Sequence, residues 1–430
     1  MFLSVYSVEN TGEKKMIVPS LLLEQVSVLP PLLLLPLILV AIAALTFTLR
    51  LRRHPRRQVH HVATKRVEKV VREPGKWEPS PYQLPIPPPY PNWSITTTKP
   101  LPYRPFRYGP KYHVTMGLRS VSPADWIELD NHYPRFHADK AARLATRADR
   151  CVRAAPEAYP AACELLSELA VYLPARYPSV FSRNTTPTGD TITNLWSDET
   201  FPISLSQIQA SEFDPMTISA RLIQDDIALM IERPSGEYHF LAGAIILPGF
   251  WRLEDKFGMS LSEIHTSGEV PQFQTKLEKG MMNFFRRLKP EEVVGRSNYF
   301  FQVDDNLAWS TSIGSEDGLP EGWSGAGVNS VAERVWFRSE RQTLRRLPRT
   351  GAVVFTIRTY FHPVTEIADE DYVPGRLASA VRSWGDDVSR YKGREKYGEA
   401  LLEYLDQKHA EQVARGLDLS REDEVRAYPY

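Results

Sequence analysis

The chain has 430 residues, and its 52 Lys and Arg side chains are balanced by 52 Asp and Glu side chains. This length allows two or three domains, and a net charge of zero gives no support to a nucleic-acid partner. The only cysteines, Cys151 and Cys163, are too few for a disulfide framework or a cysteine-based metal site. This cysteine usage is typical of a reducing compartment.

An uncharged, apolar run near the N-terminus predicts a membrane span. It covers residues 26–49 and is followed by five arginines between positions 50 and 57. A helix of about 20 apolar residues crosses a bilayer, and the basic flank favours a cytosolic location for the rest of the chain. We therefore predict a single-pass membrane protein with a short external or lumenal segment, residues 1–25. A buried core helix is the alternative.

Residues 50–112 have the composition of a linker. They are basic at first and then Pro-rich, with seven prolines between positions 79 and 91. Such sequences favour extended, polyproline-type chain over a packed core. We predict a semi-rigid spacer, with a ligand for an SH3 or WW domain as the alternative.

The folded region is predicted to cover residues 113–430. Ser122 and Pro123 indicate a helix start, because Ser is a favoured N-cap and Pro is favoured at the first helical position. Two further helices are predicted over 138–153 and 156–173. Residues 183–200 are rich in Thr, Asn, Ser and Asp, and this composition predicts a loop.

The middle of the chain, about 215–362, predicts a five-stranded core. Apolar residues recur at helical spacing over 260–290, between the second and third strands, and two helices near 375–390 and 393–412 close the chain. This order is typical of an α+β, PAS-like domain, in which helices cross one face of an antiparallel sheet. The predicted strands are Thr217–Ile231, Tyr238–Leu247, Asn298–Val303, Glu333–Phe337 and Ala352–Tyr360.

No common nucleotide, zinc-protease or hydrolase motif is present, so the candidate residues are individual ones. His265 lies within the predicted helical stretch. A neutral imidazole is a good axial ligand for haem iron, and a surface or core histidine is the alternative. His362, at the end of a predicted strand of the same sheet, is the next candidate ligand.

An arginine-rich segment is the second candidate. Four arginines lie within nine residues from Arg338 to Arg346, between two predicted strands. Arginine forks bind carboxylates, and haem propionates are carboxylates. Arg338, Arg341 and Arg345 are therefore candidates at the rim of a cavity, and a structural Arg–Glu network is the alternative.

Two acidic residues and one aromatic–basic pair complete the set of candidates. Asp225 and Asp226, on the first predicted strand, are placed to hold a cationic amine, although exposed acidic residues are more common. Trp251 and Lys256 are placed beside a cofactor, with core packing as the alternative.

Together these stretches resemble the haem-dependent oxidative N-demethylase alpha-subunit-like family, also known as the HRQ family. The resemblance runs from about residue 113 to residue 390, and its most specific part is the segment that begins Glu340-Arg341-Gln342. The family motif commonly continues Ile-His-x-Pro-Val-Pro, whereas a longer stretch follows Ile264-His265 here. The other matching stretches are Met116–Leu118, Ala124–Asp130, Gln224–Asp226, Trp251–Gly258 and Thr350–Arg358.

The resemblance implies a PAS-like fold that binds haem b and oxidatively demethylates a small secondary amine. It implies that His265 is the iron ligand, and we place Gln342 with Asp225 and Asp226 in the catalytic set. Electrons are implied to come from NADPH through flavin and iron–sulfur partners. Since the chain carries no flavin or iron–sulfur motif, we expect a separate reductase. We therefore predict a haem monooxygenase that acts on an amine or on another small molecule. The alternatives are a non-enzymatic haem-binding or gas-sensing module, and a haem-free interaction protein that uses its Pro-rich linker.

Overall fold

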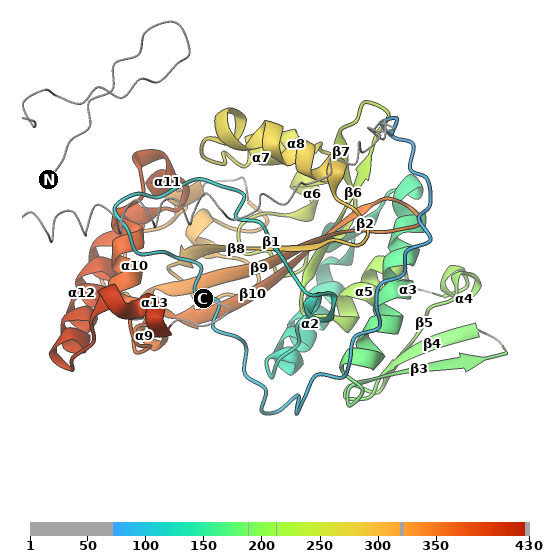
Figure 1. Ribbon diagram of the computed structural model, residues 1–430, viewed down its shortest axis with the longest axis horizontal. Helices are drawn as coiled ribbons and strands as arrows, with labels where there is room; N and C mark the ends of the chain where they lie inside the picture. Colours follow the sequence, from blue (N-terminus) through green and yellow to red (C-terminus); the bar gives the residue numbers. More distant parts are fainter. Residues whose placement is uncertain (1–71, 188, 212, 319–321, 426–430) are drawn as a thin grey trace, which may run out of the picture. The chain divides into compact units, whose positions relative to one another are not determined.

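The computed structural model describes residues 72–187, 189–211, 213–318 and 322–425. All of them belong to one unit that begins at Arg72. The described chain is a mixed α+β structure with one seven-stranded and one three-stranded antiparallel sheet (Figure 1). The α+β prediction is therefore confirmed.

The large sheet contains all five predicted strands as its central members, so the predicted number of five is corrected to seven. The two additional strands are short edge strands of two and three residues. In spatial order the sheet is β1 (Arg119–Ser120), β8 (Val293–Gln302), β9 (Trp336–Arg346), β10 (Val353–Pro363), β6 (Asp226–Glu232), β7 (Tyr238–Ala244) and β2 (Val152–Ala154).

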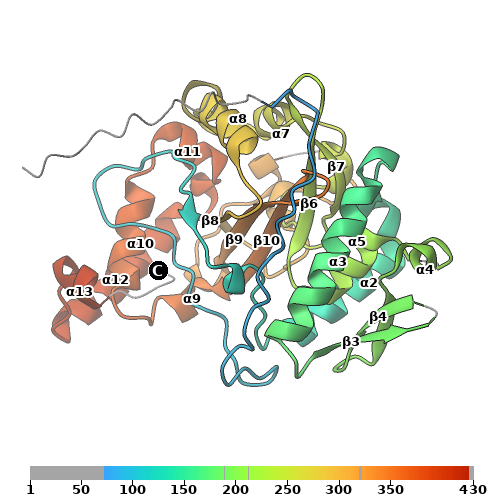
Figure 2. The same cartoon turned by 45° about the vertical axis from the view of Figure 1, so that its right-hand side comes forward.

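Helices cover both faces of this sheet (Figure 2). One face, here called the α8 face, carries Leu344, Val353 and Phe355, which pack with helices α6 (Leu253–Lys256), α7 (Leu261–Ser267) and α8 (Glu278–Arg287). A π-helical turn, Phe273–Leu277, precedes α8. The helical prediction for residues 260–290 is thus confirmed, as a broken rather than a continuous helix.

The opposite face, here called the α3 face, packs on α2 (Tyr133–Cys151), α3 (Tyr159–Arg176) and α5 (Pro215–Leu222) through residues such as Ile227 and Val354. The first two helices confirm the predictions over 138–153 and 156–173. A second part of this face, around Phe301 and Phe337, contacts the C-terminal helices. The C-terminal helices are α9 (Val364–Ile367), α10 (Val373–Arg382), α11 (Asp386–Tyr391), α12 (Gly398–Ala414) and α13 (Glu422–Val425).

The loop predicted over residues 183–200 is wrong, because this region forms the three-stranded sheet. Ile192 and Phe201 face each other across two of its strands and are buried. Two apolar residues among many polar ones do not produce a clear alternation of polar and apolar positions, so the sequence does not predict strands here. The sheet consists of β3 (Phe181–Thr186), β4 (Gly189–Asn194) and β5 (Glu199–Pro202), followed by helix α4 (Leu205–Gln209).

Two further predicted boundaries are corrected. Helix α5 replaces the first half of the strand predicted from Thr217, because Asp214 caps the backbone N–H groups of residues 216 and 217 and Pro215 takes the first helical position. The helix predicted at Ser122 is a single 3-10 turn, Pro123–Asp125, although its Ser cap is formed.

Strand β9 extends through the arginine-rich segment, which was predicted to connect two strands. Its residues are buried on both faces from Phe337 to Arg346. A strand that is buried on both sides loses the alternation of polar and apolar residues by which strands are recognised. The arginines therefore lie inside the sheet and not at the rim of a cavity.

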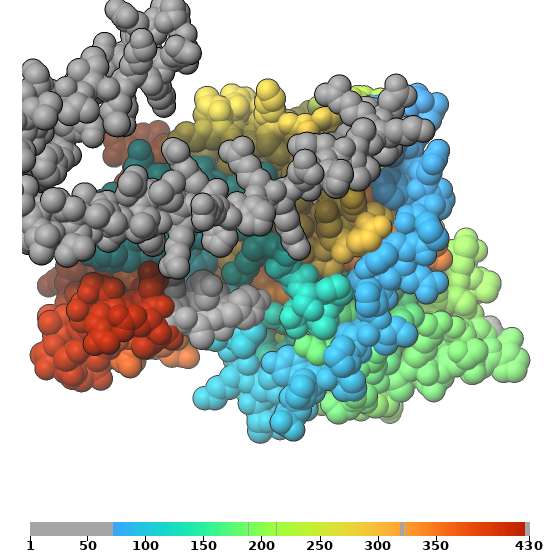
Figure 3. Space-filling model, in the orientation of Figure 1, coloured from blue at the N-terminus to red at the C-terminus, as the bar shows by residue number. Residues whose placement is uncertain are grey.

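Residues 72–118 run over the domain with little regular structure but with firm anchoring. Tyr90 and Trp93 pack against Tyr177 at the end of α3, with ring centroids 6.4 and 5.1 Å away. Farther along, Tyr103 and Phe106 are buried in the core. In Figure 3 the blue part of this segment lies along the surface beside the green elements that include α3.

The prediction of a membrane location is not upheld. Within the described ranges, no helix combines the length and the apolar composition that a bilayer crossing requires. The run that led to the prediction, residues 26–49, lies outside the described residues, as does the segment 1–25. We therefore withdraw the membrane location and the cytosolic placement of the C-terminal part.

A glycine substitution tests the anchoring of the N-terminal segment. Gly351 has a φ of +74°, and a Cβ there would lie 2.3 Å from the Trp77 ring. An alanine in the left-handed conformation costs roughly 1–2 kcal/mol. Because the added Cβ would also overlap the Trp77 ring, we expect Gly351→Ala to lower the free energy of unfolding, measured in urea, by well over this amount. Gly416→Ala is the matched control, since its φ is +94° but no atom lies within 4 Å. Equal losses in the two variants would show that Trp77 does not pack on this turn.

Candidate haem site on the α8 face

The middle of the large sheet keeps solvent-accessible surface on its α8 face. On β9 and β10, Gln342 and Ile357 are 6% and 9% exposed there. Their neighbours on the α3 face, Arg341 and Arg358, are 2% and 0% exposed. Side chains alternate between the faces of a strand, so this difference shows that the helices close over the α8 face less completely.

His265 lies above this face in α7. The helix starts with a capping box in which Ser260 and Glu263 bond each other's backbone N–H groups, and this fixes its position. The His265 Nδ1 lies 2.7 Å from the Leu261 carbonyl oxygen, and the ring stacks on Phe273 at 4.8 Å and 13°. Because a carbonyl oxygen can only accept, Nδ1 carries the proton and Nε2 keeps its lone pair.

The imidazole of His265 is held in its neutral form. Burial lowers its pKa, the nearby charge of Arg296 lowers the pKa further, and the hydrogen bond to Leu261 acts in the opposite direction. A neutral imidazole with one nitrogen fixed by a carbonyl is the form in which histidine binds a metal.

Arg296 lies opposite Gln342 on the neighbouring strand β8, so both side chains project from the α8 face. Its guanidinium has no ion pair or hydrogen bond within the described chain, and its Nε is buried without a partner. Burial lowers the pKa of Arg296, and Glu340 opposes this effect. An arginine that is partly removed from water and has no carboxylate partner can bind an anionic group of a ligand by donating hydrogen bonds to it.

Glu340 and Gln342 flank Arg296 on β9. Gln342 Nε2 donates to Glu340 Oε2 at 2.9 Å, while Gln342 Oε1 is buried without a partner. Burial raises the pKa of Tyr391 to about 12, and Glu340 adds to the shift. Burial also raises the pKa of Tyr112, which Arg296 counteracts. These groups therefore surround Arg296.

The candidate arginines fall on different faces. Arg338 shares the α8 face, but its guanidinium donates to the carbonyl groups of Leu247 and Leu307, and it is 0% exposed. It therefore stabilises the fold.

Arg341 and Arg345 lie on the α3 face, away from His265. Arg341 pairs with Glu128 at 3.1 Å and donates to the Trp126 carbonyl oxygen. Arg345 pairs with Glu168 and lies 4.8 Å from the Trp126 ring centroid. The structure does not bring these two arginines together with His265, and Glu340, on the α8 face, does not orient Arg345.

The two candidate aspartates are also separated. Asp226 faces the α8 side, where it accepts a hydrogen bond from the Leu247 N–H at 2.9 Å and lies 3.8 Å from Lys140 Nζ. Asp225 faces the α3 side and is fully buried. Neither is placed beside His265.

Trp251 and Lys256 belong to the same layer as His265. Trp251 packs edge-on against Phe240, with ring centroids 6.4 Å apart, and Lys256 Nζ donates to Ser267 Oγ at 2.7 Å. His362 lies elsewhere, 3.4 Å from Glu366. The structure thus gathers His265, Trp251, Lys256 and Gln342 on one side of the sheet.

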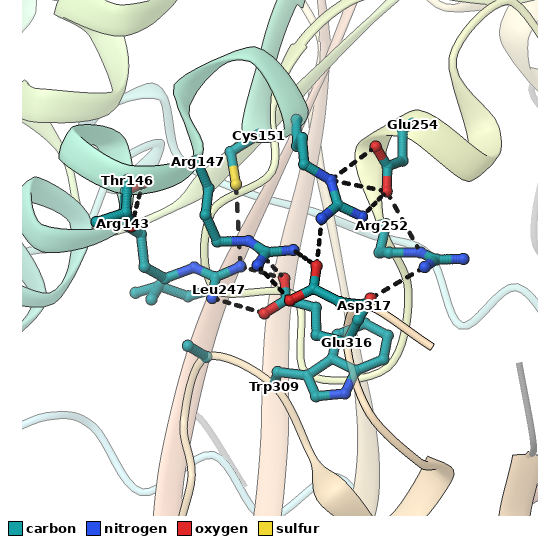
Figure 4. A network of polar contacts seen from close by, with 12 residues as sticks. Arg143, Thr146, Arg147, Cys151, Leu247, Arg252, Glu254, Trp309, Glu316 and Asp317 are labelled. Atoms are coloured by element: carbon teal, nitrogen blue, oxygen red, sulfur yellow. Dashed lines mark hydrogen bonds and ion pairs between the residues drawn. The ribbon is translucent and has the colours of Figure 1, made fainter. Parts of the chain in front are cut away.

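A second polar cluster joins the end of α2 to the loop before residue 318 (Figure 4). Arg143 and Arg147 bind Glu316 and Asp317, and Arg252 donates to the Glu316 carbonyl oxygen at 3.0 Å. The charges of this cluster are paired with one another, so it fixes the loop. No group of three or more His, Cys, Asp or Glu side chains within the described ranges could hold a metal ion.

A family comparison agrees with this geometry. Residues 117–402 match the family described as "Haem-dependent oxidative N-demethylase, alpha subunit-like". The chain belongs to this family. Membership connects the chain with haem-dependent oxidative chemistry and, through the words "alpha subunit", with partner subunits.

Sequence reasoning missed Arg296, Tyr112 and Tyr391. The strand predicted from Asn298 begins at Val293, so Arg296 was left outside it. Extending that strand towards its N-terminus would have placed Arg296 on the same face as Asn298. No sequence signal connects the two tyrosines, which come from distant segments.

The buried Asp225 provides a test by pH. Burial raises its pKa to about 6 from 3.8, while Arg358 and Arg341 oppose the shift. An acid with a raised pKa in the folded state destabilises the fold once it ionises. Relative to the wild type, Asp225→Asn should therefore gain about 2.4 kcal/mol of stability between pH 4 and pH 7.

The measurement is the free energy of unfolding in urea for both proteins across this pH range. Any constant effect of the substitution on packing cancels in the pH dependence. A difference between the two proteins that does not change with pH would show that Asp225 ionises as easily in the fold as in the unfolded chain.

Proposed function

We propose that the α8 face holds haem b and that the protein is a haem-dependent oxidoreductase of the monooxygenase class that acts on an amine. The observation that carries the proposal is the His265 imidazole, whose Nδ1 is fixed by the Leu261 carbonyl oxygen and whose Nε2 keeps a free lone pair. The family match supports the choice of haem.

The residues present fit such a cofactor. Phe273 stacks on His265, and Leu344 belongs to the same apolar cluster of the α8 face, while a porphyrin ring is mostly apolar. Arg296 provides a half-buried cation whose Nε has no partner within the described chain, which suits a propionate. His265 would bind the iron, and Arg296 would bind a carboxylate at the edge of the ring.

Haem would supply the oxygen chemistry, and the chain would supply binding and orientation. The Leu261 carbonyl oxygen fixes the ring angle and the tautomer of His265. Electrons would come from a separate NADPH-dependent reductase, which accords with the family term "alpha subunit".

We also propose that the central strands and the helices over them form a PAS-like core. The five central strands follow the order β7, β6, β10, β9, β8, with helices crossing the α8 face. This arrangement also suits a non-enzymatic haem-binding or gas-sensing module, which is the second candidate function. Amine-dependent consumption of NADPH with a reductase present would favour the enzyme, and a stable haem spectrum without such turnover would favour the sensor.

The ligand assignment is tested by spectroscopy of the full chain. The wild type should show a Soret band, and His265→Ala should lose it or shift it strongly, because the axial nitrogen is removed. His239→Ala is the matched control, since its Nδ1 also lies 2.9 Å from a backbone carbonyl oxygen, that of Gly258. An unchanged Soret band in folded His265→Ala would eliminate His265 as the ligand and make His362 the next residue to test.

The role of Arg296 is tested by a pair of conservative changes. Arg296→Lys keeps the charge but loses the planar fork. The dissociation constant of haem should therefore rise about tenfold, which corresponds to the loss of one charge-assisted hydrogen bond. Arg341→Lys changes the same residue type on the α3 face and should lower the melting temperature with little change in haem affinity. The reverse pattern would move the propionate contact to the α3 face.

A further inference from the structure

An extended segment, and not a strand, closes one side of the α8 layer. Residues 109–118, here called the strap, lead from beside α10 and α11 to β1 (Figures 1 and 2). Strand β1 pairs with β8 only at Gly295 and Val294. Beyond these positions the strap approaches β8, where the charge of Arg296 acts to lower the pKa of Tyr112.

The strap packs through alternate side chains. Its inward residues join the apolar clusters of the sheet and of the helical layer. Met116 Cε lies 3.7 Å from the position that a Cβ would take on Gly280 of α8. The strap therefore bridges β8 and α8. The half-buried residues are Tyr112, Val114, Met116 and Leu118, and the exposed ones are Lys111, His113, Thr115 and Gly117.

Hydrogen bonds fix only the first part of the strap. The Tyr112 N–H donates to the Ser383 carbonyl oxygen at 3.2 Å, and the Gly109 N–H donates to Ser379 Oγ at 3.1 Å. In the described chain no backbone group of residues 113–117 bonds another backbone group. Helix α7, by contrast, is held by its capping box. Segments with few backbone hydrogen bonds open at the lowest free energy, so the strap is the part of this layer that opens most easily.

Glycines lie at both ends of the loosely bonded part. The φ angles of Gly109 and Gly117 are +148° and +63°, and no atom lies within 4 Å of the position of a Cβ on either residue. The backbone conformation, and not the surrounding space, therefore favours glycine at both positions. A few residues of this kind can absorb the rotation when a segment moves as a unit.

The α8 face is narrowly accessible in this conformation. Glu340, Gln342 and Ile357, in the middle of the sheet, are 8%, 6% and 9% exposed. A binding site covers most of the surface of its ligand, so a ligand of the size of a porphyrin needs far more of this face. An element that covers the face therefore has to move before such a ligand can enter or leave.

We propose that residues 110–116 form a gate that swings on Gly109 and Gly117, and that it admits and releases the ligand of the α8 face. In the closed position its inward side chains pack on the helical layer. In the open position they leave α8, and the side of the layer next to β8 is free. The inference rests on the proposed function in taking the α8 face as the binding site.

Thiol labelling of the full-length protein measures the opening of the gate. Met116→Cys places a thiol on the inward side, and Thr115→Cys places one on the outward side. Iodoacetamide, followed by mass spectrometry of this peptide, gives each rate without interference from Cys151 and Cys163. We expect Met116→Cys to react more slowly than Thr115→Cys, because the closed gate holds position 116 against α8.

A hinge variant then shifts the gate towards the open position. Gly117→Ala places an alanine in the left-handed conformation of the closed gate, which should speed the labelling of Met116→Cys about tenfold. Gly416→Ala is the matched control, since its φ is +94° and no atom lies within 4 Å, and it should leave the rate unchanged. Equal rates in the two variants would overturn the gate, because the thiol would then report general unfolding or no movement.

Haem exchange measures the role of the gate in binding. Transfer of ferric haem from the full-length protein to excess apomyoglobin gives the rate of release, and loading of the haem-free protein gives the rate of entry. Because the ligand passes the same gate in both directions, Gly117→Ala should raise both rates about tenfold and leave the dissociation constant unchanged. A changed dissociation constant with an unchanged rate of entry would overturn the gate and make Gly117 part of the binding surface.

The Soret absorbance of each sample separates the gate from the proposed function. If haem is bound normally and neither haem rate responds to Gly117→Ala, the gate is wrong and the proposed function stands. If no sample shows a Soret band, the proposed function fails and the labelling decides on the gate. Faster labelling in Gly117→Ala alone then supports the gate, and an unchanged rate overturns it.

Discussion

The alternation of side chains along β9 is the constraint on which this structure depends. The strand lies in the interior of the sheet with helices on both sides, and its residues from Phe337 to Arg346 are buried. Because successive side chains point to opposite faces, each polar residue of this segment is assigned to one of two environments. Burying a charge without a partner is costly, so both environments must supply partners.

The α3 face supplies those partners from the protein itself. Arg345 pairs with Glu168, and Arg358 of the neighbouring strand pairs with Asp130 at 2.6 Å. These arginines are fully buried. Removing one member of such a pair would leave the other charge buried, without solvent and without a counter-charge. The arginines of this face therefore hold α2, α3 and the segment around Trp126 to the sheet.

The α8 face also carries polar groups that lack protein partners. Arg296 and Gln342 lie opposite each other on neighbouring strands, Gln342 Oε1 is buried without a partner, and His265 lies in the helical layer over the same face. The N-terminal segment contributes to the same region through Met116, which packs with the apolar cluster of the α8 face. Buried polar atoms without a partner occur on both faces, among them the Asp225 carboxylate on the α3 face, so the assignment of a ligand to the α8 face depends on His265.

The sequence by itself determined the helices over α2 and α3, the five central strands, the family resemblance and His265 as the candidate iron ligand. These features depend on local propensity, apolar spacing and a long motif, all of which are present in the order of residues. It did not determine the sheet formed by residues 181–202, where two facing apolar residues, Ile192 and Phe201, are too few to give a period.

Only the tertiary structure decided which residues of the arginine-rich segment share a face of the sheet with His265. Arg341 and Gln342 are neighbours in the sequence and were both placed near the site, yet adjacent residues of a strand cannot share a face. The register of β9 against β8 places Gln342 opposite Arg296 and Arg341 opposite Ser297. A segment buried on both sides carries no polar–apolar alternation from which this choice could be made, so the packing of helices on each face was needed to make it.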